Sequence, residues 1–502
     1  MITYLSRIYI ILLIFASLIF SAASPATRDY VAESFNTGDG AYHFYDDFPT
    51  EHPKSIHLFQ WLSAASLWLL YQASDRERFA KRRAFEAAAY VAGAGCILFF
   101  WQSAIVVILL LSIMGFSWSD SAPARSQTAW ILAALFVFSL LLRMEKLPNV
   151  MNQPLQPDSV QYVSYSQECE GFYATHHREP LWAWVNYGLS RIFPVPDDVA
   201  EHGYIPIRLT TIFLSSAGVL LAYLFGKRWI SHRVGLAAAL LMTVNKALIY
   251  RSLQGLRLEL LILAVFALLW LSWTSPSSKK AANGITIGLG LTGAILLLLR
   301  TSCLPIVFFC FAWSLWSGKQ SLKQILTASA ICLLPVMPYY AYCWMEYGDP
   351  LYSGNAHIRF YYKAILGEYP PDGQRISPFQ FMFQIFSWYE TAFYTAAGVV
   401  EAFWGRYALR LFYLPFSVFL VGCSAAGYLH WLRTPERRIL AISALLLLGP
   451  MAFFLGILIK SPTVFDWRLV AHLFPFMAYA AAEGFFFLVQ KTGWIGKTGR
   501  VQ

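Results

Sequence analysis

Asp158 is the residue whose place in this sequence best suits an acid–base reaction. Pro154 and Pro157 should keep the preceding chain extended, because a proline disfavours helix in the residue before it. Asp158 or Ser159 would then cap a short helix that runs within residues 160–173. A carboxylate held at the tip of such a helix can take a proton from an attacking hydroxyl group. The alternative is that Asp158 only caps the helix and that its segment is only a lid.

Six basic residues in and after this segment have the chemistry to bind a phosphate. Arginine offers a planar fork of donors that matches a phosphate group. Arg300 is the strongest candidate for binding a phosphate, because it interrupts the apolar segment 284–317. The alternative is that these side chains only extend along the membrane surface to reach water. The six residues are Arg178, Arg208, Lys246, Arg251, Arg257 and Arg300.

Further residues are weaker candidates for the same site. Glu259 follows Arg257 by two positions, one turn into an apolar segment, where a carboxylate needs a partner or a wet cavity. An ion pair with Arg257 or Arg208 explains Glu259 as well as a catalytic role does. The other candidates, in two outer loops and at the start of the last apolar segment, are Tyr162, Arg178, Glu179, His357, Arg359, Arg468 and His472.

No metal site follows from the spacing of potential ligands. The cysteines form no CxxC motif and no pattern with histidine that is typical of zinc. The stretch 39–52 is dense in aspartate, glutamate and histidine, which are ligands for divalent cations. Its spacing matches no known site, so a solvated loop is the preferred interpretation. No cofactor is therefore expected, and a divalent cation stays open as an alternative.

The composition requires that lipid covers much of this protein. Of the 502 residues, 57% are hydrophobic and only 13% are charged, whereas soluble domains average about 25% charged residues. The 18 Trp and 28 Tyr suit side chains at headgroup depth. The net charge of +10 is better explained by cytoplasmic loops and lipid phosphate than by nucleic acid. We predict an integral membrane protein with no nucleic-acid partner.

Apolar segments of roughly 20 residues, the length that crosses a bilayer, recur along the chain and predict an all-α polytopic protein. Two segments, 84–117 and 284–317, are too long for one helix and should form tight hairpins, which gives about 14 transmembrane helices. The predicted segments are 5–23, 56–73, 84–117, 127–143, 205–225, 234–251, 254–274, 284–317, 324–343, 408–431, 439–460 and 467–489.

The basic short loops set the orientation of these helices. Stretches such as GKRWISHR (226–233) and GKQSLK (318–323) should lie in the cytoplasm, where lysine and arginine are enriched. The large loops then lie outside, and helices within 144–204 should rest at the interface, with tryptophan and tyrosine at headgroup depth. Four regions follow: an N-terminal transmembrane extension, a module with the outer loop 144–204, a second outer loop, and C-terminal helices. Their bounds are 1–126, 127–343, 344–407 and 408–502.

The order of short motifs in 127–343 resembles the C-type membrane glycosyltransferases (GT-C). A span that ends in LLR (141–143) is followed by PDSVQYVSYSQ, HREPLWAW, a span that opens with IRL, an RLE, and a span that ends in LLLLRTS. This order is similar to the branch of dolichyl-phosphate-mannose protein mannosyltransferases and lipid A aminoarabinose transferases. The loop YGDPLYSGNA (347–356) also looks like bacterial members of that branch.

The resemblance implies a reaction and a place for it. Asp158 stands where the family has an acidic residue at the start of an outer interfacial helix, and it would be the general base. Ser159 stands where many members have a second acid. The donor would be a polyprenyl-phosphate sugar, the acceptor a hydroxyl of a glycan, lipid or protein, and single displacement would invert the anomeric centre. We expect a multi-pass protein of the bacterial inner membrane, with its site facing the periplasm or the exterior.

Two other classes fit parts of the sequence. A lipid-linked glycan flippase or transporter would need ionisable residues along a central path or two related halves, and the sequence has neither. A polysaccharide polymerase or ligase would also use arginines in outer loops. A site at the membrane surface explains best why the charges gather at one rim.

Overall fold

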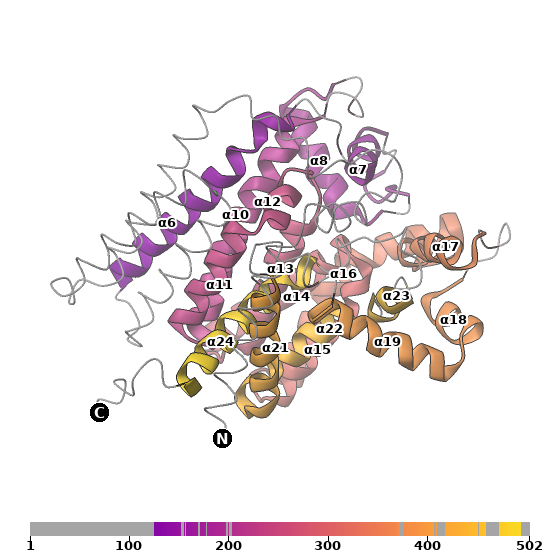
Figure 1. Ribbon diagram of the computed structural model, residues 1–502. Coiled ribbons are helices and arrows are strands. Elements are labelled where there is room, and N and C mark those ends of the chain that lie inside the picture. Colours follow the sequence, from indigo (N-terminus) through magenta and orange to yellow (C-terminus); the bar gives the residue numbers. More distant parts are fainter. Residues whose placement is uncertain are drawn as a thin grey trace, which may run out of the picture.

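The computed structural model describes residues 125–492 with short gaps, and the described part of the chain contains helices and no strands (Figure 1). The predicted extension 1–126 thus lies almost wholly outside the described residues. The gaps are 152–154, 156, 169–170, 177, 197–198, 200–202, 369, 371–375, 406–407, 409–416, 450 and 458–470.

Three helices in the described residues are long and apolar enough to cross a membrane. They are α10 (Ile205–Trp229), α14 (Lys279–Leu299) and α16 (Leu322–Tyr347). A fourth span would join Pro435–Leu448 to Met451–Ile457 through a 65° bend. The shorter apolar helices are α6, α11, α13, α15 and α24. The all-helical fold is confirmed for the described residues, the apolar helices are compatible with a membrane protein, and the count of about 14 spans stays a prediction.

The core of the molecule is a bundle around α10. The helix packs against α6 (Arg125–Met144), α11 (His232–Val244) and α13 (Leu258–Trp273), and α24 (Phe474–Thr492) closes the group against α11. Gly226 and Gly235 let α10 and α11 touch, since a Cβ atom at Gly226 would lie 2.5 Å from the Cα of Gly235. Phe225, Phe266 and Tyr479 fill the space between three of these helices.

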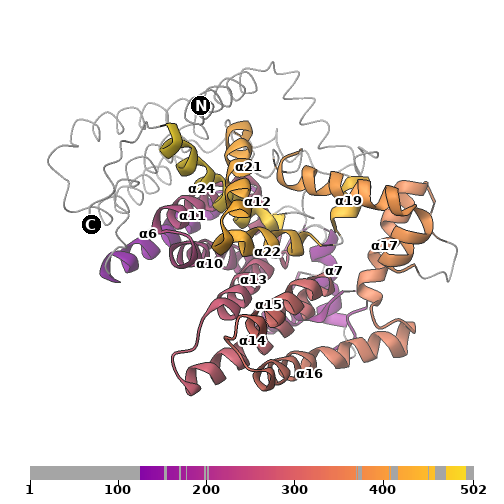
Figure 2. The ribbon, with the colours of Figure 1, turned by 90° about the horizontal axis from the view of Figure 1, so that it is seen from below.

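Two further groups of helices flank this bundle (Figure 2). In the first, α14 packs against α16, with α15 (Leu304–Trp316) beside them. In the second, α21 (Ser417–Arg433) packs along α24, and α22 (Arg438–Leu448) lies against α21. To one side lie α17 (Tyr352–Leu366), α18 (Pro378–Gln380), α19 (Trp388–Phe403) and α23 (Met451–Ile457), together with a π-helical turn, η3 (Phe381–Ile385).

Two of the predicted apolar segments are broken by polar residues. Segment 284–317 divides at Arg300 into α14 and α15, joined by the 3₁₀ turn η2 (Thr301–Cys303). The predicted break at this point is confirmed. Segment 234–251 was predicted as one apolar segment, but α11 ends at Val244, and the side chain of Asn245 caps the short helix α12 (Lys246–Ser252). Both breaks lie at the end of the bundle that carries the first outer loop.

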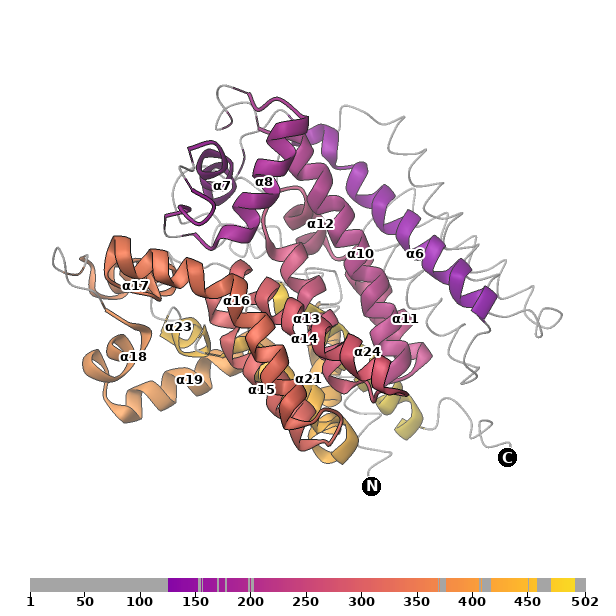
Figure 3. The ribbon, with the colours of Figure 1, turned by 180° about the vertical axis from the view of Figure 1, so that it is seen from behind.

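The first outer loop forms two helices, as the sequence predicted. They are α7 (Pro157–Glu168) and α8 (Pro180–Ile192), and they pack against each other beside the start of α10 (Figure 3). Ser159 Oγ donates a hydrogen bond to the carbonyl of Gln254 at 2.7 Å, and Trp182 Nε1 donates to that of Gly255 at 3.1 Å. Gly255 has a φ of +72°, a conformation that favours glycine. The segment before α13 is thus the platform that receives both loop helices.

The contact between α21 and α24 gives a test of this packing. A Cβ atom at Gly427 would lie 1.9 Å from the carbonyl oxygen of Ala480, so Gly427→Ala should lower the free energy of unfolding by about 1–3 kcal/mol. Gly284 is also helical and has open space around it, so Gly284→Ala is the control and should be neutral or slightly stabilising. Thermal unfolding of the two purified variants in detergent would measure the difference. Equal melting temperatures would contradict the close contact.

Candidate functional site

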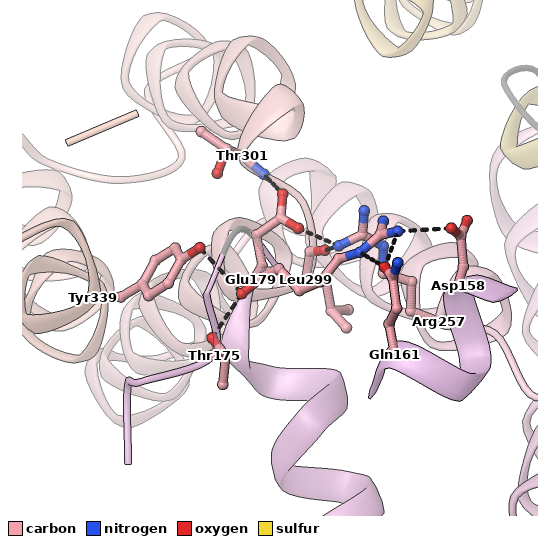
Figure 4. A network of polar contacts seen from close by, with 9 residues as sticks. Asp158, Gln161, Thr175, Glu179, Arg257, Leu299, Thr301 and Tyr339 are labelled. Atoms are coloured by element: carbon pink, nitrogen blue, oxygen red, sulfur yellow. Dashed lines mark hydrogen bonds and ion pairs between the residues drawn. The ribbon is translucent and has the colours of Figure 1, made fainter. Parts of the chain in front are cut away.

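Asp158 lies in the first turn of α7 and forms an ion pair with Arg178. The distance from Arg178 Nη2 to Asp158 Oδ1 is 2.7 Å, and the aspartate side chain is 39% exposed while the arginine is buried. Arg178 also donates from Nε and Nη2 to Gln161 Oε1, at 3.1 and 2.7 Å (Figure 4). The predicted capping role was wrong, because the helix begins at Pro157, so that Asp158 and Ser159 lie inside it.

Glu179 connects the outer loop to the two segments behind it. Its Oε2 forms an ion pair with Arg257 Nη1, and its Oε1 accepts a hydrogen bond from the backbone N–H of Thr301 at 3.0 Å. Arg257 Nη1 also donates to the carbonyl of Leu299 at 2.5 Å. Figure 4 shows these contacts converging on Glu179. The predicted pairs of Glu259 with Arg257 or Arg208 were therefore wrong, since Arg257 uses Glu179 and no ion pair of Glu259 forms among the described residues.

Tyr162 lies between the two buried guanidinium groups. Those of Arg178 and Arg257 each lie 5.6 Å from the centre of its ring. The side chain is 1% exposed, and its hydroxyl has no hydrogen-bond partner among the described residues. Burial raises the pKa of Tyr162 to about 12, against the opposing effect of the neighbouring arginines. The phenol is therefore protonated at neutral pH, and it offers a hydrogen-bond donor inside the site.

Arg300 differs from Arg178 and Arg257 because it has no carboxylate partner in the described part of the chain. It ends α14 with an extended backbone, and its side chain is half-buried. Its neighbours Leu299 and Thr301 are the two residues held by Arg257 and Glu179. Its charge also acts on His472, which is buried with Nε2 3.1 Å from the carbonyl oxygen of Leu447.

Arg208 and Arg251 lie in a buried layer beneath the outer loop. Arg208 Nη1 donates to the carbonyl of Leu253 at 2.5 Å, and Arg251 Nη1 donates to Gln254 Oε1 at 2.7 Å. Both side chains are 5% exposed or less. Both residues were predicted to bind the donor phosphate, but in this structure their buried side chains donate to acceptors within the protein. Their contacts instead hold the platform before α13 in place.

Arg143 is a member of this layer that the sequence analysis did not single out. It is fully buried at the end of α6, where it donates to Ser215 Oγ at 2.9 Å and to Ser139 Oγ at 2.8 Å. The LLR motif at the end of the segment 127–143 could have indicated this role of Arg143, because an arginine at the end of an apolar segment is tolerated only with buried polar partners.

The remaining candidates lie at the edge of the described site or outside it. Lys246 begins α12 and His357 lies in α17, but the described structure does not include these two side chains. Arg359 is exposed on α17, a helix that packs against η2. Arg468 lies outside the described residues, as does the stretch 39–52. No group of three or more side chains that could hold a metal ion is found within the described residues.

Neither models of protein families nor curated protein sequences match this chain. The resemblance to the GT-C glycosyltransferases stays a hypothesis that rests on motif order. The geometry of the outer loop is therefore the main evidence on function.

The Glu179–Arg257 pair makes a prediction about stability. Glu179→Gln should lower the free energy of unfolding by about 3–5 kcal/mol, because it leaves the Arg257 charge in a mostly buried place without its carboxylate. The double variant Glu179→Gln/Arg257→Gln should lose less than the sum of the two single variants, since neither charge then remains alone. Denaturant unfolding of the four proteins would measure the coupling. Strictly additive losses would show that the pair contributes nothing of its own.

Proposed function

We propose that this chain is a membrane glycosyltransferase that moves a sugar from a polyprenyl-phosphate-linked donor to a hydroxyl acceptor on the non-cytoplasmic face. One observation carries the proposal: a partly exposed carboxylate, Asp158, lies in a cluster with Arg178 and Arg257, and Glu179 links that cluster to the turn of Arg300. Three arginines against two carboxylates leave one positive charge at this place, which suits an anionic donor.

Asp158 has the surroundings of a general base for a hydroxyl acceptor. The ion pair with Arg178 fixes the direction of the carboxylate, while its 39% exposure leaves it within reach of a second substrate. A base in this position takes the hydroxyl proton as the oxygen attacks the anomeric carbon, and the lipid phosphate departs with the bonding electrons. Such proton transfer contributes about 10²–10⁴-fold to a rate.

Arg300 suits the leaving phosphate better than the other arginines do. Negative charge grows on the phosphate oxygen as the glycosidic bond breaks, and a fixed cation stabilises it. Arg178 and Arg257 already face carboxylates, whereas Arg300 does not within the described residues. Tyr162, whose hydroxyl has no hydrogen-bond partner among the described residues, offers a neutral donor in the same region.

The structure also bears on the residue that replaces the second acid. The Ser159 hydroxyl donates to the carbonyl of Gln254, at the docking face of α7. The site as proposed therefore works with one acidic residue at the tip of the helix. We expect single displacement with inversion, with Asp158 as the sole base.

Asp158→Asn tests the role of the base. The variant should lose about 10²–10⁴-fold in sugar transfer from a polyprenyl-phosphate donor, because asparagine cannot accept the proton. Glu168→Gln is the matched control, since it removes an exposed carboxylate at the other end of α7, and it should keep its activity. Transfer of labelled sugar in membranes with equal amounts of each protein would measure both. Full activity of Asp158→Asn would exclude the proposed mechanism and favour a flippase, which needs no base at this position.

Arg300→Gln tests the contact with the donor phosphate. Loss of one charge-assisted contact should weaken transition-state binding by about 1.5–3 kcal/mol, or roughly 10- to 150-fold in kcat/KM for the donor. Arg191→Gln removes an exposed arginine from the end of α8 and should change kcat/KM less than twofold. Steady-state kinetics with varied donor would separate the two. An unchanged kcat/KM in Arg300→Gln would assign the phosphate to another cation.

A further inference from the structure

A second cluster of cations lies at the opposite end of the bundle from Asp158. The helix α10 has 25 residues and rises about 1.5 Å per residue, so Trp229 is roughly one bilayer thickness away from Ile205, which lies near the outer loop. The guanidinium carbon of Arg228 lies 5.2 Å from the ring centre of Trp229 and 5.1 Å from that of Trp270. Lys319 Nζ lies 5.9 Å from the same Trp229 ring.

Three segments that are distant in sequence meet at this cluster. Trp229 ends α10, Trp273 ends α13, and Lys319 lies in the turn between α15 and α16. The rings of Trp229 and Trp273 are 5.5 Å apart and nearly perpendicular, and Lys319 donates to the carbonyl of Trp273 at 2.8 Å. The cluster is thus built by the tertiary structure, and its cations have defined positions over an aromatic surface.

The cations of this cluster lack acidic partners within the part of the chain that the structure describes. Neither Arg228 nor Lys319 forms an ion pair with any residue that the structure describes. The flanking stretches 226–233, 274–280 and 317–324 contain no aspartate or glutamate. In addition, the indole N–H groups of Trp229 and Trp273 have no acceptor among the described residues. This end of the bundle therefore has an excess of positive charge and of hydrogen-bond donors.

We propose that Arg228, Lys319 and Trp229 form a binding site for the headgroup phosphate of an anionic phospholipid. Tryptophan is enriched at headgroup depth, and the negative potential of an anionic leaflet attracts cations that lie close to it. The aromatic rings hold both cations by cation–π contact, which limits the rotamer entropy that binding would otherwise cost. A phosphate oxygen brings a negative charge and a further acceptor to Arg228 and Lys319. The site is independent of the proposed sugar transfer, because it lies at the other end of the bundle.

Native mass spectrometry of the purified full-length chain tests this site. The protein is placed in nanodiscs that contain phosphatidylglycerol and phosphatidylcholine in equal amounts, and the lipids that stay bound on release are counted. We expect phosphatidylglycerol to be retained preferentially by the unmodified protein. Equal retention of the two lipids would overturn the proposal without the use of any variant.

Two double variants test whether the preference for phosphatidylglycerol arises at the tryptophan cluster. Arg228→Gln/Lys319→Gln should reduce the retention of phosphatidylglycerol about 10- to 30-fold, since two of the surface charges are lost. Lys280→Gln/Lys323→Gln removes the same charge from flanking stretches outside the tryptophan cluster and should change retention less than threefold. Trp229→Phe keeps an aromatic side chain but replaces the indole by a smaller phenyl ring, which weakens the cation–π contacts, with a smaller expected loss of about threefold. Equal losses in the two double variants would show that total charge, not this cluster, attracts the lipid.

Discussion

The carboxylate of Glu179 holds together three parts of the chain that are far apart in the sequence. It pairs with Arg257, which is 78 residues away, and it accepts the backbone N–H of Thr301, which is 122 residues away. A buried carboxylate is tolerated only where its charge and its lone pairs are matched, so these contacts fix one arrangement of the loop, α13 and the turn after α14. The neighbouring Arg178 then directs its guanidinium toward Asp158, and the position of the candidate base follows from this arrangement.

The arginines near the outer loop divide into three environments, and this division gives the site its chemistry. Arg208 and Arg251 are buried and donate to Leu253 and Gln254, so they shape the platform. Arg178 and Arg257 face carboxylates and order the loop. Arg300 has no such partner among the described residues. Residues of one type therefore differ in role because their surroundings differ in charge and in available acceptors.

The two ends of the bundle use cations in different ways. At the end of the bundle that carries the outer loop, carboxylates balance most of the positive charge, and a small excess of positive charge remains beside Asp158. At the end of the bundle that contains Trp229, the cations lie over aromatic rings, in stretches without acidic residues. The described cations thus have carboxylates as neighbours at one end of the bundle and aromatic rings at the other.

The sequence by itself determined the helical membrane architecture, the break at Arg300 and the two helices of the outer loop, because hydrophobic runs, proline positions and an isolated charge act locally. The sequence also identified Asp158 and several arginines as candidate site residues. Only the tertiary structure decided which charges meet: that Glu179 and not Glu259 pairs with Arg257, and that Arg208 and Arg251 are buried. The physical reason is that a charge takes the nearest partner in space, and the loop between α7 and α8 brings Glu179 to Arg257 across 78 residues of sequence. Helix periodicity does not encode a contact of that length.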